Sequence, residues 1–388
     1  MPKHSFQHFH LSSQMMNALH KMHFCQPTEV QCHAIMPALS GQDLLVQAPT
    51  GTGKTAAFGI PMIENIQVKK GLQGLVLCPT RELAIQTGKV LSQLAQCQKG
   101  IRVVTVYGGE SIGRQFSALR QRPQIVVATP GRLLDHMKRK SIQLKQIQIL
   151  IMDEADRMLD MGFRDDLQTI LSKTPSGRQT LLFSATMSKE IMNIAKDYQK
   201  DPKHIIVQKN SETSQGQIQQ YFAEIPEKAK LSNLQHVLQQ EACSLSLVFV
   251  NTKTKAEELT KKLQKLGLRA AFMHGGLRQP ERDKVMRMYR TRKLDVLVAT
   301  DVAARGIDVK EIDTVINYDW PLEPENYVHR IGRTGRAKQS GTAYTFVCPN
   351  ERHKLKNMAR NSKMKIERMP KLMTNPDKRV APSAQKTA

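Results

Sequence analysis

The sequence has 388 residues, of which 40% are hydrophobic and 24% are charged. This length suggests about two or three domains of roughly 100–200 residues each, and the apolar share excludes a chain that is disordered over most of its length. Lys and Arg outnumber Asp and Glu by 58 to 34, a net charge of +24. That excess favours a polyanionic partner, with nucleic acid ahead of an anionic membrane.

The six cysteines form no C-x-x-C pair and no Cys/His cluster with zinc spacing. Scattered thiols are typical of a reducing compartment. The first residues contain no apolar run of the kind found in a secretory signal, and no stretch approaches 18 consecutive apolar residues. We therefore expect a soluble, cytoplasmic protein with no membrane partner, present as a monomer.

In the first half of the chain, short apolar and β-branched runs alternate with helical patterns. Such alternation predicts a parallel sheet with helices on both faces. It ends at Ile205–Val207, and residues 208–217 contain no large apolar side chain, as expected for a flexible linker. The predicted strands are Leu44–Gln47, Leu75–Cys78, Val103–Tyr107, Ile125–Ala128, Ile149–Met152 and Leu181–Phe183.

The alternation then restarts, which predicts a second α/β domain over residues 218–350 after a first domain over 1–207. The two halves do not repeat each other at any short period. The second set of predicted strands is Gln220–Ile225, Leu247–Val250, Ala270–Met273, Val296–Ala299, Val315–Tyr318 and Ala343–Val347.

Residues 351–388 form a basic tail with eleven Lys or Arg and three Asp or Glu. Glu351–Arg368 is compatible with a basic helix, whereas Pro370, Pro376 and Pro382 disfavour a helix beyond it, so we expect the tail to be partly disordered. We favour an accessory RNA tether whose affinity depends on salt. A solubilising tail, a protein-docking segment and a nuclear import signal are the alternatives.

A phosphate-binding loop is predicted after the first strand, because Ala48-Pro49-Thr50-Gly51-Thr52-Gly53-Lys54-Thr55 lies between that strand and a helical pattern. Its glycines let backbone N–H groups approach phosphate, Lys54 reaches the β- and γ-phosphates, and Thr55 can ligate Mg²⁺. Ala48 stands where the general pattern has Gly, and Pro61 is expected to kink the following helix. The alternative is a glycine-rich turn with a chance lysine.

Two carboxylates, Asp153 and Glu154, follow the strand Ile149–Met152. Ligands bind outside the carboxyl ends of strands in open α/β sheets. Asp153 is therefore placed to hold Mg²⁺, partly through water, and Glu154 to orient and deprotonate an attacking water. The alternative is a carboxylate pair that starts the next helix.

With these motifs the chain resembles the DEAD-box ATP-dependent RNA helicases, in particular bacterial members with a short basic tail. The tetrapeptide Asp153-Glu154-Ala155-Asp156 is the name motif of that family. The resemblance covers residues 6 to about 348 and implies two tandem RecA-like domains. The other matching segments, in family order, are Phe24–Gln31, Pro79–Ala84, Gly108-Gly109, Thr129–Arg132, Ser184–Thr186, Val248–Thr252, Gln279–Arg282, Thr300-Asp301, Ala304–Asp308 and His329–Arg336.

The resemblance implies that ATP is the nucleotide. Gln31 can pair with an adenine edge through both atoms of its amide, and Phe6 can stack on the base. For Phe6 the alternative is a packing role under the helix Ser12–Met22. His23 replaces the usual glycine of this motif, which affects only the local turn.

In the second domain the resemblance implies that Arg333 and Arg336 are arginine fingers, with His329 beside them in the catalytic set and Arg330 close by. Such fingers neutralise charge on the γ-phosphate. Because Lys54 and Glu154 belong to the first domain, hydrolysis is expected to require closure of the two domains over ATP. The ribose contact falls on Asp308, with Gly306 allowing close approach.

The resemblance also implies RNA contacts and a coupling segment. Ser184 and Thr186 are expected to couple the ATP state to work on RNA, whereas an ordinary turn is the alternative. The RNA residues offer polar groups and glycines suited to phosphate and ribose, so they position a strand without reading its sequence. They are Arg81, Gly109, Thr129 and Arg132 in the first domain and Gly275, Arg282 and Thr300 in the second.

The function expected from all these features is RNA-dependent ATP hydrolysis coupled to local separation of short RNA duplexes or remodelling of RNA–protein complexes. Single-stranded and duplex RNA are the expected partners. By family analogy we expect a role in ribosome assembly or RNA decay, with ribosomal precursors or decay proteins as further partners. The alternatives are an ATP-gated RNA clamp with slow turnover and a DNA helicase or translocase.

Overall fold

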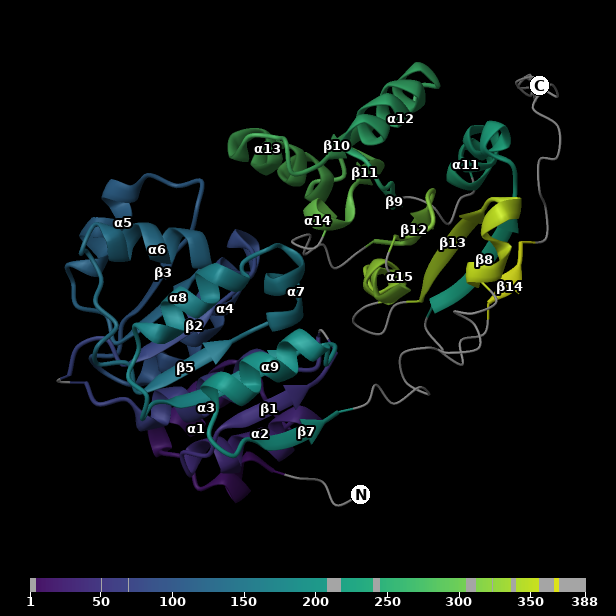
Figure 1. Cartoon of the computed structure of the whole chain (residues 1–388). Helices are drawn as coiled ribbons and strands as arrows, with labels where there is room; N and C mark the ends of the chain where they lie inside the picture. The colour runs from purple at the N-terminus through teal and green to yellow at the C-terminus, as the bar shows by residue number, and fades with distance from the viewer. Residues whose placement is uncertain are drawn as a thin grey trace, which may run out of the picture. The chain divides into compact units, whose positions relative to one another are not determined.

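The computed structural model describes residues 5–49, 51–68, 70–207, 218–239, 245–304, 312–322, 324–335, 340–355 and 366–369. The chain divides into two compact units, one up to Lys209 and one from Asn210 onward. This division falls inside the predicted linker, 208–217, which lies outside the described residues. Each unit is a sheet flanked by helices (Figure 1).

The first unit is built on a parallel sheet whose described strands have the order β3-β4-β2-β5-β6-β1-β7. Every neighbouring pair is parallel, so the carboxyl ends of the strands lie along one edge. The six predicted strands of this half are confirmed, and β7 (Lys203–Ile206) is an additional strand at the end of the unit. The six are β1 (Leu44–Gln47), β2 (Gly74–Leu77), β3 (Val103–Val106), β4 (Ile125–Ala128), β5 (Ile149–Met152) and β6 (Gln179–Ser184).

Helices cover both faces of this sheet, as the near-continuous apolar strands predicted. Successive strand residues point to opposite faces. Val46 and Val76 enter one core and Leu45 and Leu75 the other. The helices are η1 (Phe6–Phe9), α1 (Ser13–Lys21), α2 (Glu29–Leu39), α3 (Lys54–Asn65), α4 (Arg81–Leu94), η2 (Ala95–Cys97), α5 (Ile112–Leu119), α6 (Pro130–Lys138), α7 (Ala155–Asp160), α8 (Arg164–Ser172) and α9 (Lys189–Tyr198).

Two local predictions about backbone conformation can be compared with the structure. Pro61 lies inside α3 and does not end it, since the helix continues to Asn65. His23 has a φ of 56°, a left-handed conformation that glycine adopts without strain. The turn therefore keeps the shape that the missing glycine would give it.

Within the part of the chain that the structure describes, no helix combines the length and apolar character needed to cross a membrane.

The second unit repeats the topology of the first. Its described strands have the order β10-β11-β9-β12-β13-β8-β14 and are parallel throughout. Counted from the first strand of each unit, the two orders are identical. The strands are β8 (Ile218–Glu224), β9 (Ser246–Phe249), β10 (Ala270–Met273), β11 (Val296–Ala299), β12 (Thr314–Asn317), β13 (Gly341–Val347) and β14 (Glu367–Arg368).

The helices of the second unit follow the same strand–helix alternation. Clusters of buried apolar side chains again lie on the two faces of the sheet, with Val248 in one cluster and Leu247 in another. The helices are η3 (Glu227–Ala229), α11 (Lys230–Leu238), α12 (Lys253–Lys265), α13 (Gln279–Arg290), α14 (Asp301–Ala304), α15 (Pro324–Ile331) and η4 (Pro349–Glu351).

The strand β14 corrects one prediction. Glu351–Arg368 is compatible with a basic helix in the sequence, and residues 352–355 are helical. Residues 356–365 lie outside the described part of the chain, and Glu367 and Arg368 instead pair with β8 in parallel register. The adjacent Met369 is 6% exposed and belongs to the apolar core of the second unit. Burial of this methionine and pairing with the sheet edge outweigh the local charge pattern on which the helix prediction rested.

We expect Met369→Ala to lower the free energy of unfolding of the second unit by about 2 kcal/mol, because truncating a buried methionine typically costs about 2–5 kcal/mol and this site lies at a sheet edge. Trp320 is the single tryptophan of the chain and is buried in the second unit. Urea unfolding followed by its fluorescence therefore reports on that unit.

The matched control is Arg368→Ala, since Arg368 is exposed in the same strand. Surface substitutions of this kind usually change the free energy by less than about 0.5 kcal/mol. Equal midpoints for the two variants would show that residues 366–369 add nothing to the core of the second unit.

Candidate functional site

Five strands of the first sheet, β1 to β5, are each followed by a predicted motif. Ala48 follows β1, Arg81 opens the helix after β2, and Gly109 lies in the loop after β3. Thr129 follows β4 and Asp153 follows β5. Because all these strands are parallel, their carboxyl ends bring the motifs to one edge of the sheet.

The phosphate-binding loop has the backbone that its glycines predicted. Gly51 and Gly53 have φ values of 81° and 90°, which side chains rarely allow. The helix α3 begins at Lys54 directly after Gly53, so its N-terminus faces the loop. Lys54 is buried, and its Nζ donates to the carbonyl oxygen of Ala48 at 3.0 Å. Loop, lysine and helix N-terminus therefore have the arrangement that the predicted phosphate site requires, and phosphate binding itself stays a prediction.

Gln31 connects the predicted adenine motif to that loop. Its Oε1 accepts a hydrogen bond from the Thr28 N–H at 3.0 Å, and its Nε2 donates to the Gly53 carbonyl at 3.1 Å. A Cβ on residue 53 would lie 2.6 Å from this Nε2, so only glycine leaves room for the contact. These bonds use part of the hydrogen-bonding capacity of the amide. Its pairing with adenine stays a prediction.

Phe6 packs in the core of the first unit. It is 3% exposed, and its ring lies 6.0 Å from that of Phe9 and 6.3 Å from that of Phe24, measured between centroids. This position is the one that the packing alternative predicts. Stacking of Phe6 on a base stays a prediction.

Asp153 and Glu154 are buried at the end of β5, and their environments differ. Burial raises the pKa of Asp153 to about 6, although Lys54 acts in the opposite direction. The Glu154 carboxylate pairs with the Arg157 guanidinium at 2.5 Å. Glu154 also has a left-handed backbone, with φ of 52°, and precedes α7. Strain at a non-glycine residue of this kind is a feature of functional sites.

The residues around Asp153 fit a magnesium ion bound together with nucleotide phosphates. Asp153 Oδ1 is buried and has no hydrogen-bond partner, so it retains full capacity as a metal ligand. The hydroxyl of Thr55 lies in the first turn of α3, on the phosphate loop. Among the described residues no group of three or more His, Cys, Asp or Glu side chains forms a metal site. One carboxylate with water and phosphate oxygens is nevertheless the donor set that Mg²⁺ commonly uses.

Asp156 links this carboxylate group to the predicted coupling segment. Its Oδ2 accepts hydrogen bonds from the backbone N–H groups of Ala185 and Thr186, both at 3.0 Å, and from the Thr186 hydroxyl at 3.2 Å. The Ser184 hydroxyl instead donates to the Thr186 carbonyl at 2.6 Å. The expected contact between a coupling hydroxyl and a carboxylate is thus found for Thr186. Sequence reasoning gave no role to Asp156, although the motif itself includes it.

Three predicted RNA residues of the first unit meet at the loop after β3. The Arg81 guanidinium lies over the Tyr107 ring at 5.0 Å and donates to the Gly109 carbonyl at 3.5 Å. Arg132 donates through Nη1 and Nη2 to the Glu110 carbonyl at 3.1 and 3.2 Å. Gly109 has a φ of 83°. Thr129 is buried and precedes α6, the helix that carries Arg132.

A buried polar pair supports this loop, and the sequence gave no signal for it. Gln115 donates to the Tyr107 carbonyl at 2.9 Å, and its Oε1 accepts from Arg132 at 3.3 Å. His136 is fully buried, and its Nε2 lies 3.0 Å from the same Oε1. Burial lowers the pKa of His136, which favours the neutral ring. Because the amide oxygen only accepts, the ring donates through Nε2.

The predicted RNA residues of the second unit gather around two neighbouring strands. Thr300 follows β11 and donates its backbone N–H to the carbonyl of Met273, the last residue of β10, at 3.2 Å. Gly275 lies two residues beyond Met273. Arg282 belongs to α13, and its Nε is buried without a hydrogen-bond partner.

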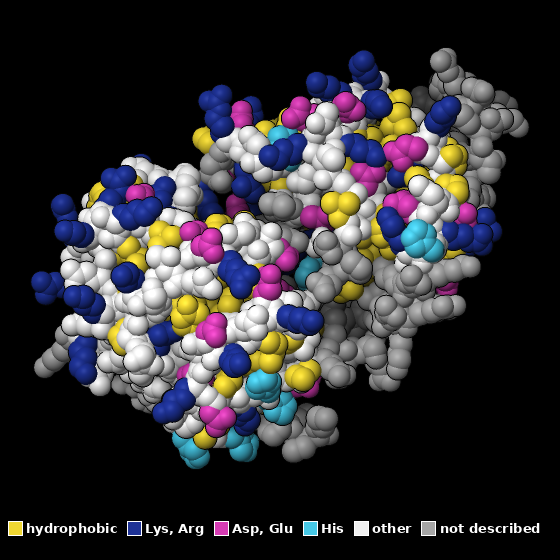
Figure 2. Space-filling view, in the orientation of Figure 1, with side chains coloured by type: hydrophobic (Ala, Val, Ile, Leu, Met, Phe, Trp, Pro, Cys, Tyr) yellow, Lys and Arg dark blue, Asp and Glu magenta, His cyan; other side chains and the backbone are white. Residues whose placement is uncertain are grey.

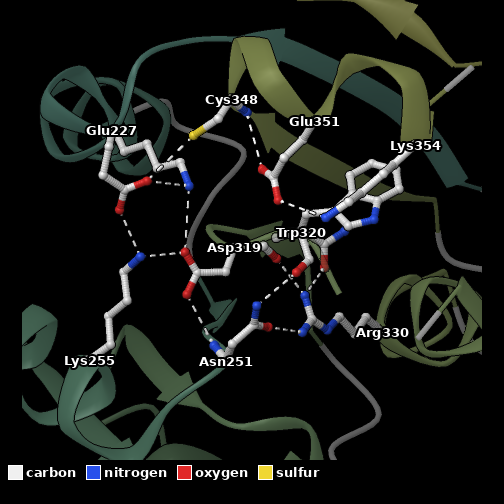
Figure 3. A network of polar contacts seen from close by, with 11 residues as sticks. Glu227, Asn251, Lys255, Asp319, Trp320, Arg330, Cys348, Glu351 and Lys354 are labelled. Carbon is white, nitrogen blue, oxygen red and sulfur yellow. Dashed lines mark hydrogen bonds and ion pairs between the residues drawn. The ribbon is translucent and has the colours of Figure 1, made fainter. Parts of the chain in front are cut away.

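Arg330 is the centre of a buried polar network in the second unit (Figure 3). It donates through Nε and Nη2 to the two carboxylate oxygens of Asp301, both at 2.6 Å, and through Nη2 to Asn251 Oδ1 at 3.0 Å. Its Nη1 donates to the Asp319 carbonyl at 2.7 Å, and its guanidinium lies over the Phe249 ring. Arg330 is 1% exposed. It therefore joins the ends of β9, β11 and β12.

Two lysines extend this network around Asp319, and Figure 3 shows the Lys255 contact. Lys255 Nζ lies 2.7 Å from Glu227 and 2.5 Å from Asp319, and Lys230 Nζ lies 2.8 Å from Glu227. Burial raises the pKa of Glu227, but hydrogen bonds from the two lysines lower it overall to about 2. Burial raises the pKa of Tyr318, beneath both lysines, to about 12.

The two catalytic candidates of the second unit that the structure describes lie on or directly after α15. His329 belongs to that helix, and Arg333 follows it, with Nε donating to the His329 carbonyl at 3.3 Å. Four predicted site residues lie outside the described part of the chain: Thr50, Gly306, Asp308 and Arg336.

The raised pKa of Asp153 predicts an unusual dependence of stability on pH. Its pKa lies at about 6 in the folded chain and near 4 in an unfolded chain. The neutral carboxyl therefore favours folding below about pH 4, and this advantage is lost as pH rises through about 6. We expect Asp153→Asn to match the unaltered protein near pH 4 and to exceed its free energy of unfolding by roughly 2–3 kcal/mol at pH 7.5. Urea unfolding followed by circular dichroism measures the difference.

Asp135 provides a control, because its pKa is shifted in the opposite direction to that of Asp153. It is exposed, and its hydrogen bond from Arg139 lowers its pKa. Its contribution is therefore present at neutral pH and lost on acidification, so Asp135→Asn should lose stability at neutral pH. An advantage of Asp153→Asn that does not grow between about pH 4 and 7.5 would contradict the buried, near-neutral carboxyl.

Comparisons with known proteins agree with this geometry. The DEAD/DEAH box helicase family model matches residues 28–194, and the helicase conserved C-terminal domain model matches residues 229–338. The chain is 46% identical, over 94% of its length and 74% of the relative, to the DEAD-box ATP-dependent RNA helicase CshA of Bacillus subtilis. It is 44% identical, over 94% and 78%, to the CshA of Geobacillus kaustophilus.

Solved structures show the same likeness. A structure of Dbp5 from S. cerevisiae bound to RNA and ADP BeF3 has a TM-score of 0.82 and 31% identity, covering 94% of this chain and 95% of that one. A structure of Mss116p bound to ssRNA and AMP-PNP has a TM-score of 0.81 and 28% identity, with coverage of 94% and 79%. The motifs, their common sheet edge and these relatives together show that the chain belongs to the DEAD-box family of ATP-dependent RNA helicases.

Proposed function

We propose that this protein hydrolyses ATP in response to RNA and uses the reaction to separate short RNA duplexes locally. One observation supports this most: the phosphate loop, the carboxylates at the end of β5 and the loop that gathers Arg81, Gly109 and Arg132 share one sheet edge. Asp156 joins the carboxylate group to the segment Ser184–Thr186 by direct hydrogen bonds. The residues proposed to bind nucleotide and RNA would thereby belong to one connected structure.

The first unit would supply most of the nucleotide chemistry. Lys54 and the loop N–H groups hold the phosphates, and Thr55 and Asp153 are the residues that would hold Mg²⁺, which neutralises charge on the β- and γ-oxygens. Glu154 orients the attacking water and accepts its proton. Arg157 fixes the Glu154 carboxylate through their buried ion pair.

The second unit would complete the catalytic set through Arg333, Arg336 and His329. An arginine finger can contribute on the order of 10³–10⁵ in rate by stabilising charge on the transferred phosphoryl group. Since Glu154 belongs to the first unit, hydrolysis requires both units to engage one nucleotide. Asp308 and Gly306 would contact its ribose, and Gln31 and Phe6 would recognise its base.

The RNA residues in both units suit phosphate and ribose, so binding would depend little on base sequence. We propose that closure of the units bends the bound strand, and that a duplex cannot follow this bend. Its partner strand then leaves, and phosphate release resets the cycle. Ser184, Thr186 and Asp156 would couple the two events.

Several finer points of the proposal rest on family analogy. We propose that the protein acts as a monomer in the cytoplasm, in ribosome assembly or RNA decay, and that its basic tail tethers RNA. Ribosomal precursors and RNA-decay proteins are the corresponding partners.

Steady-state ATP hydrolysis with and without single-stranded RNA tests the proposed activity. We expect RNA to raise the rate of the unaltered protein, and Glu154→Gln to reduce the stimulated rate by about 10²–10⁴, the usual contribution of a positioned general base. Asp160→Asn is a matched control, because Asp160 is the last residue of α7 and has no role in the proposed chemistry.

A rate of ATP hydrolysis that does not rise when single-stranded RNA is added would overturn the proposal. Repeated duplex separation by Glu154→Gln without hydrolysis would instead support an ATP-gated clamp. Strand displacement on matched RNA and DNA duplexes distinguishes an RNA helicase from a DNA helicase.

A further inference from the structure

The first unit has a cavity at the sheet edge opposite to the nucleotide motifs. Its volume is about 1500 Å³. Lining residues include Gln73, Arg102, Gln124, Gln148 and Arg178, each of which directly precedes one of the strands β2 to β6. Because these strands are parallel, the cavity lies at their amino ends, whereas the phosphate loop and Asp153 lie at the carboxyl ends. We call it the amino-edge cavity.

The charged side chains that line the amino-edge cavity are all positive. Its lining includes Lys70, Arg102, Arg122, Lys145 and Arg178 and no Asp or Glu. These five residues come from five different loops, so the positive charge is assembled by the fold and not by a local run of basic residues. Figure 2 shows dark blue Lys and Arg side chains along the left margin of the first unit, with few magenta carboxylates among them. A concave surface of one sign concentrates ions of the other.

Arg178 adds a second, independent indication of an anion. The residue is 9% exposed, and its Nη1 donates to the Pro175 carbonyl at 2.8 Å. Its Nε and Nη2 are buried and have no hydrogen-bond partner. The carboxylate of Asp43 attracts this charge, but its oxygens accept hydrogen bonds from the N–H groups of Thr180 and Lys200, each at 2.7 Å. A buried guanidinium with unused donors is costly unless an anion compensates it.

The rest of the lining is rich in amides, which favours a nucleic acid over a simple anion. Gln121, Gln143 and Gln146 are exposed in the cavity wall, and each offers a donor and an acceptor to ribose or a base edge. Gln73 and Gln124 instead use their side chains to hold the loops beneath, for example Gln73 Nε2 to the Gln67 carbonyl at 2.8 Å. The wall thus presents free polar groups on a fixed frame.

We propose that the amino-edge cavity binds phosphate groups of an RNA strand beyond the segment held at the carboxyl edge. This inference rests on the proposed function, since it takes RNA as the substrate. The cavity would retain a long RNA while the carboxyl edge acts on a short part of it. Contacts of this kind add affinity without sequence preference.

The test is the salt dependence of RNA binding by a triple variant, Lys70→Gln, Arg122→Gln and Lys145→Gln. All three residues are exposed, and glutamine matches the neighbouring lining. Each phosphate contact on a single strand contributes about −0.7 to the slope of log K against log salt concentration. For a strand of about 40 nucleotides we expect the triple variant to bind more weakly, with a slope reduced in magnitude by about 2.

A strand of about 10 nucleotides, near the usual site size of one binding domain, should show a much smaller change. The control is a second triple variant of equal charge, Lys21→Gln, Lys189→Gln and Lys196→Gln, at exposed positions of the same unit that do not line the cavity. For the strand of about 40 nucleotides, this control variant should show the same slope of log K against log salt concentration as the unaltered protein.

Equal slopes for the two triple variants on the long strand would overturn the inference, as would equal loss on the long and short strands. RNA-stimulated hydrolysis by the unaltered protein is measured in parallel. If stimulation is present and the slopes do not differ, only the amino-edge cavity is excluded. If stimulation is absent, the proposed function itself fails.

Discussion

The parallel arrangement of the strands is the constraint on which the rest of the structure depends. In a parallel sheet every strand ends at the same edge, so residues far apart in the sequence become neighbours without any further device. Lys54, Asp153 and Thr186 come together in this way, after β1, β5 and β6. The same arrangement collects the opposite ends of the strands at the amino edge, where the basic cavity lies. One topology therefore produces two surfaces with separate chemistry.

In each unit a buried charged side chain connects loops at the carboxyl edge of the sheet. In the first unit Asp156 accepts hydrogen bonds from the segment after β6. In the second, Arg330 holds Asp301 and Asn251 and so connects the segments after β9 and β11. Breaking the ion pair between Arg330 and Asp301 would leave a buried, uncompensated charge, which typically costs about 3–5 kcal/mol. These contacts consequently fix the relative positions of loops that would otherwise be independent.

Much of the site could be predicted because its signals are local. The phosphate loop depends on glycines with positive φ, on one lysine and on the helix that follows, and all of these are adjacent in the sequence. Arg330 could not be assigned in this way, since it lies in the same basic, glycine-containing segment as Arg333 and both side chains are buried. Its hydrogen bonds to Asp301 and Asn251, which are distant in the sequence, distinguish it. The amino-edge cavity was missed because its charges come from five separate loops.

The fold was predicted equally well where the strands are apolar, and less well at the end of the chain. The strand β14 has two charged residues and a single buried methionine beside it, too short a pattern to distinguish from a basic helix. Contact with β8 determines its conformation, and such a contact has no local signal in the sequence.

The position of β14 also has a consequence for how the second unit remains separate from other chains. An unpaired edge strand presents a row of free N–H and C=O groups that can recruit strands from neighbouring molecules. β14 covers part of the outer edge of β8 and brings charged side chains there, as Lys203 and His204 do on β7 in the first unit. A chain shortened before residue 366 would expose the part of the β8 edge that β14 pairs with, at Tyr221 and Phe222. The short strand thus occupies the backbone groups of β8 at these two positions, which a strand of another chain could otherwise pair with.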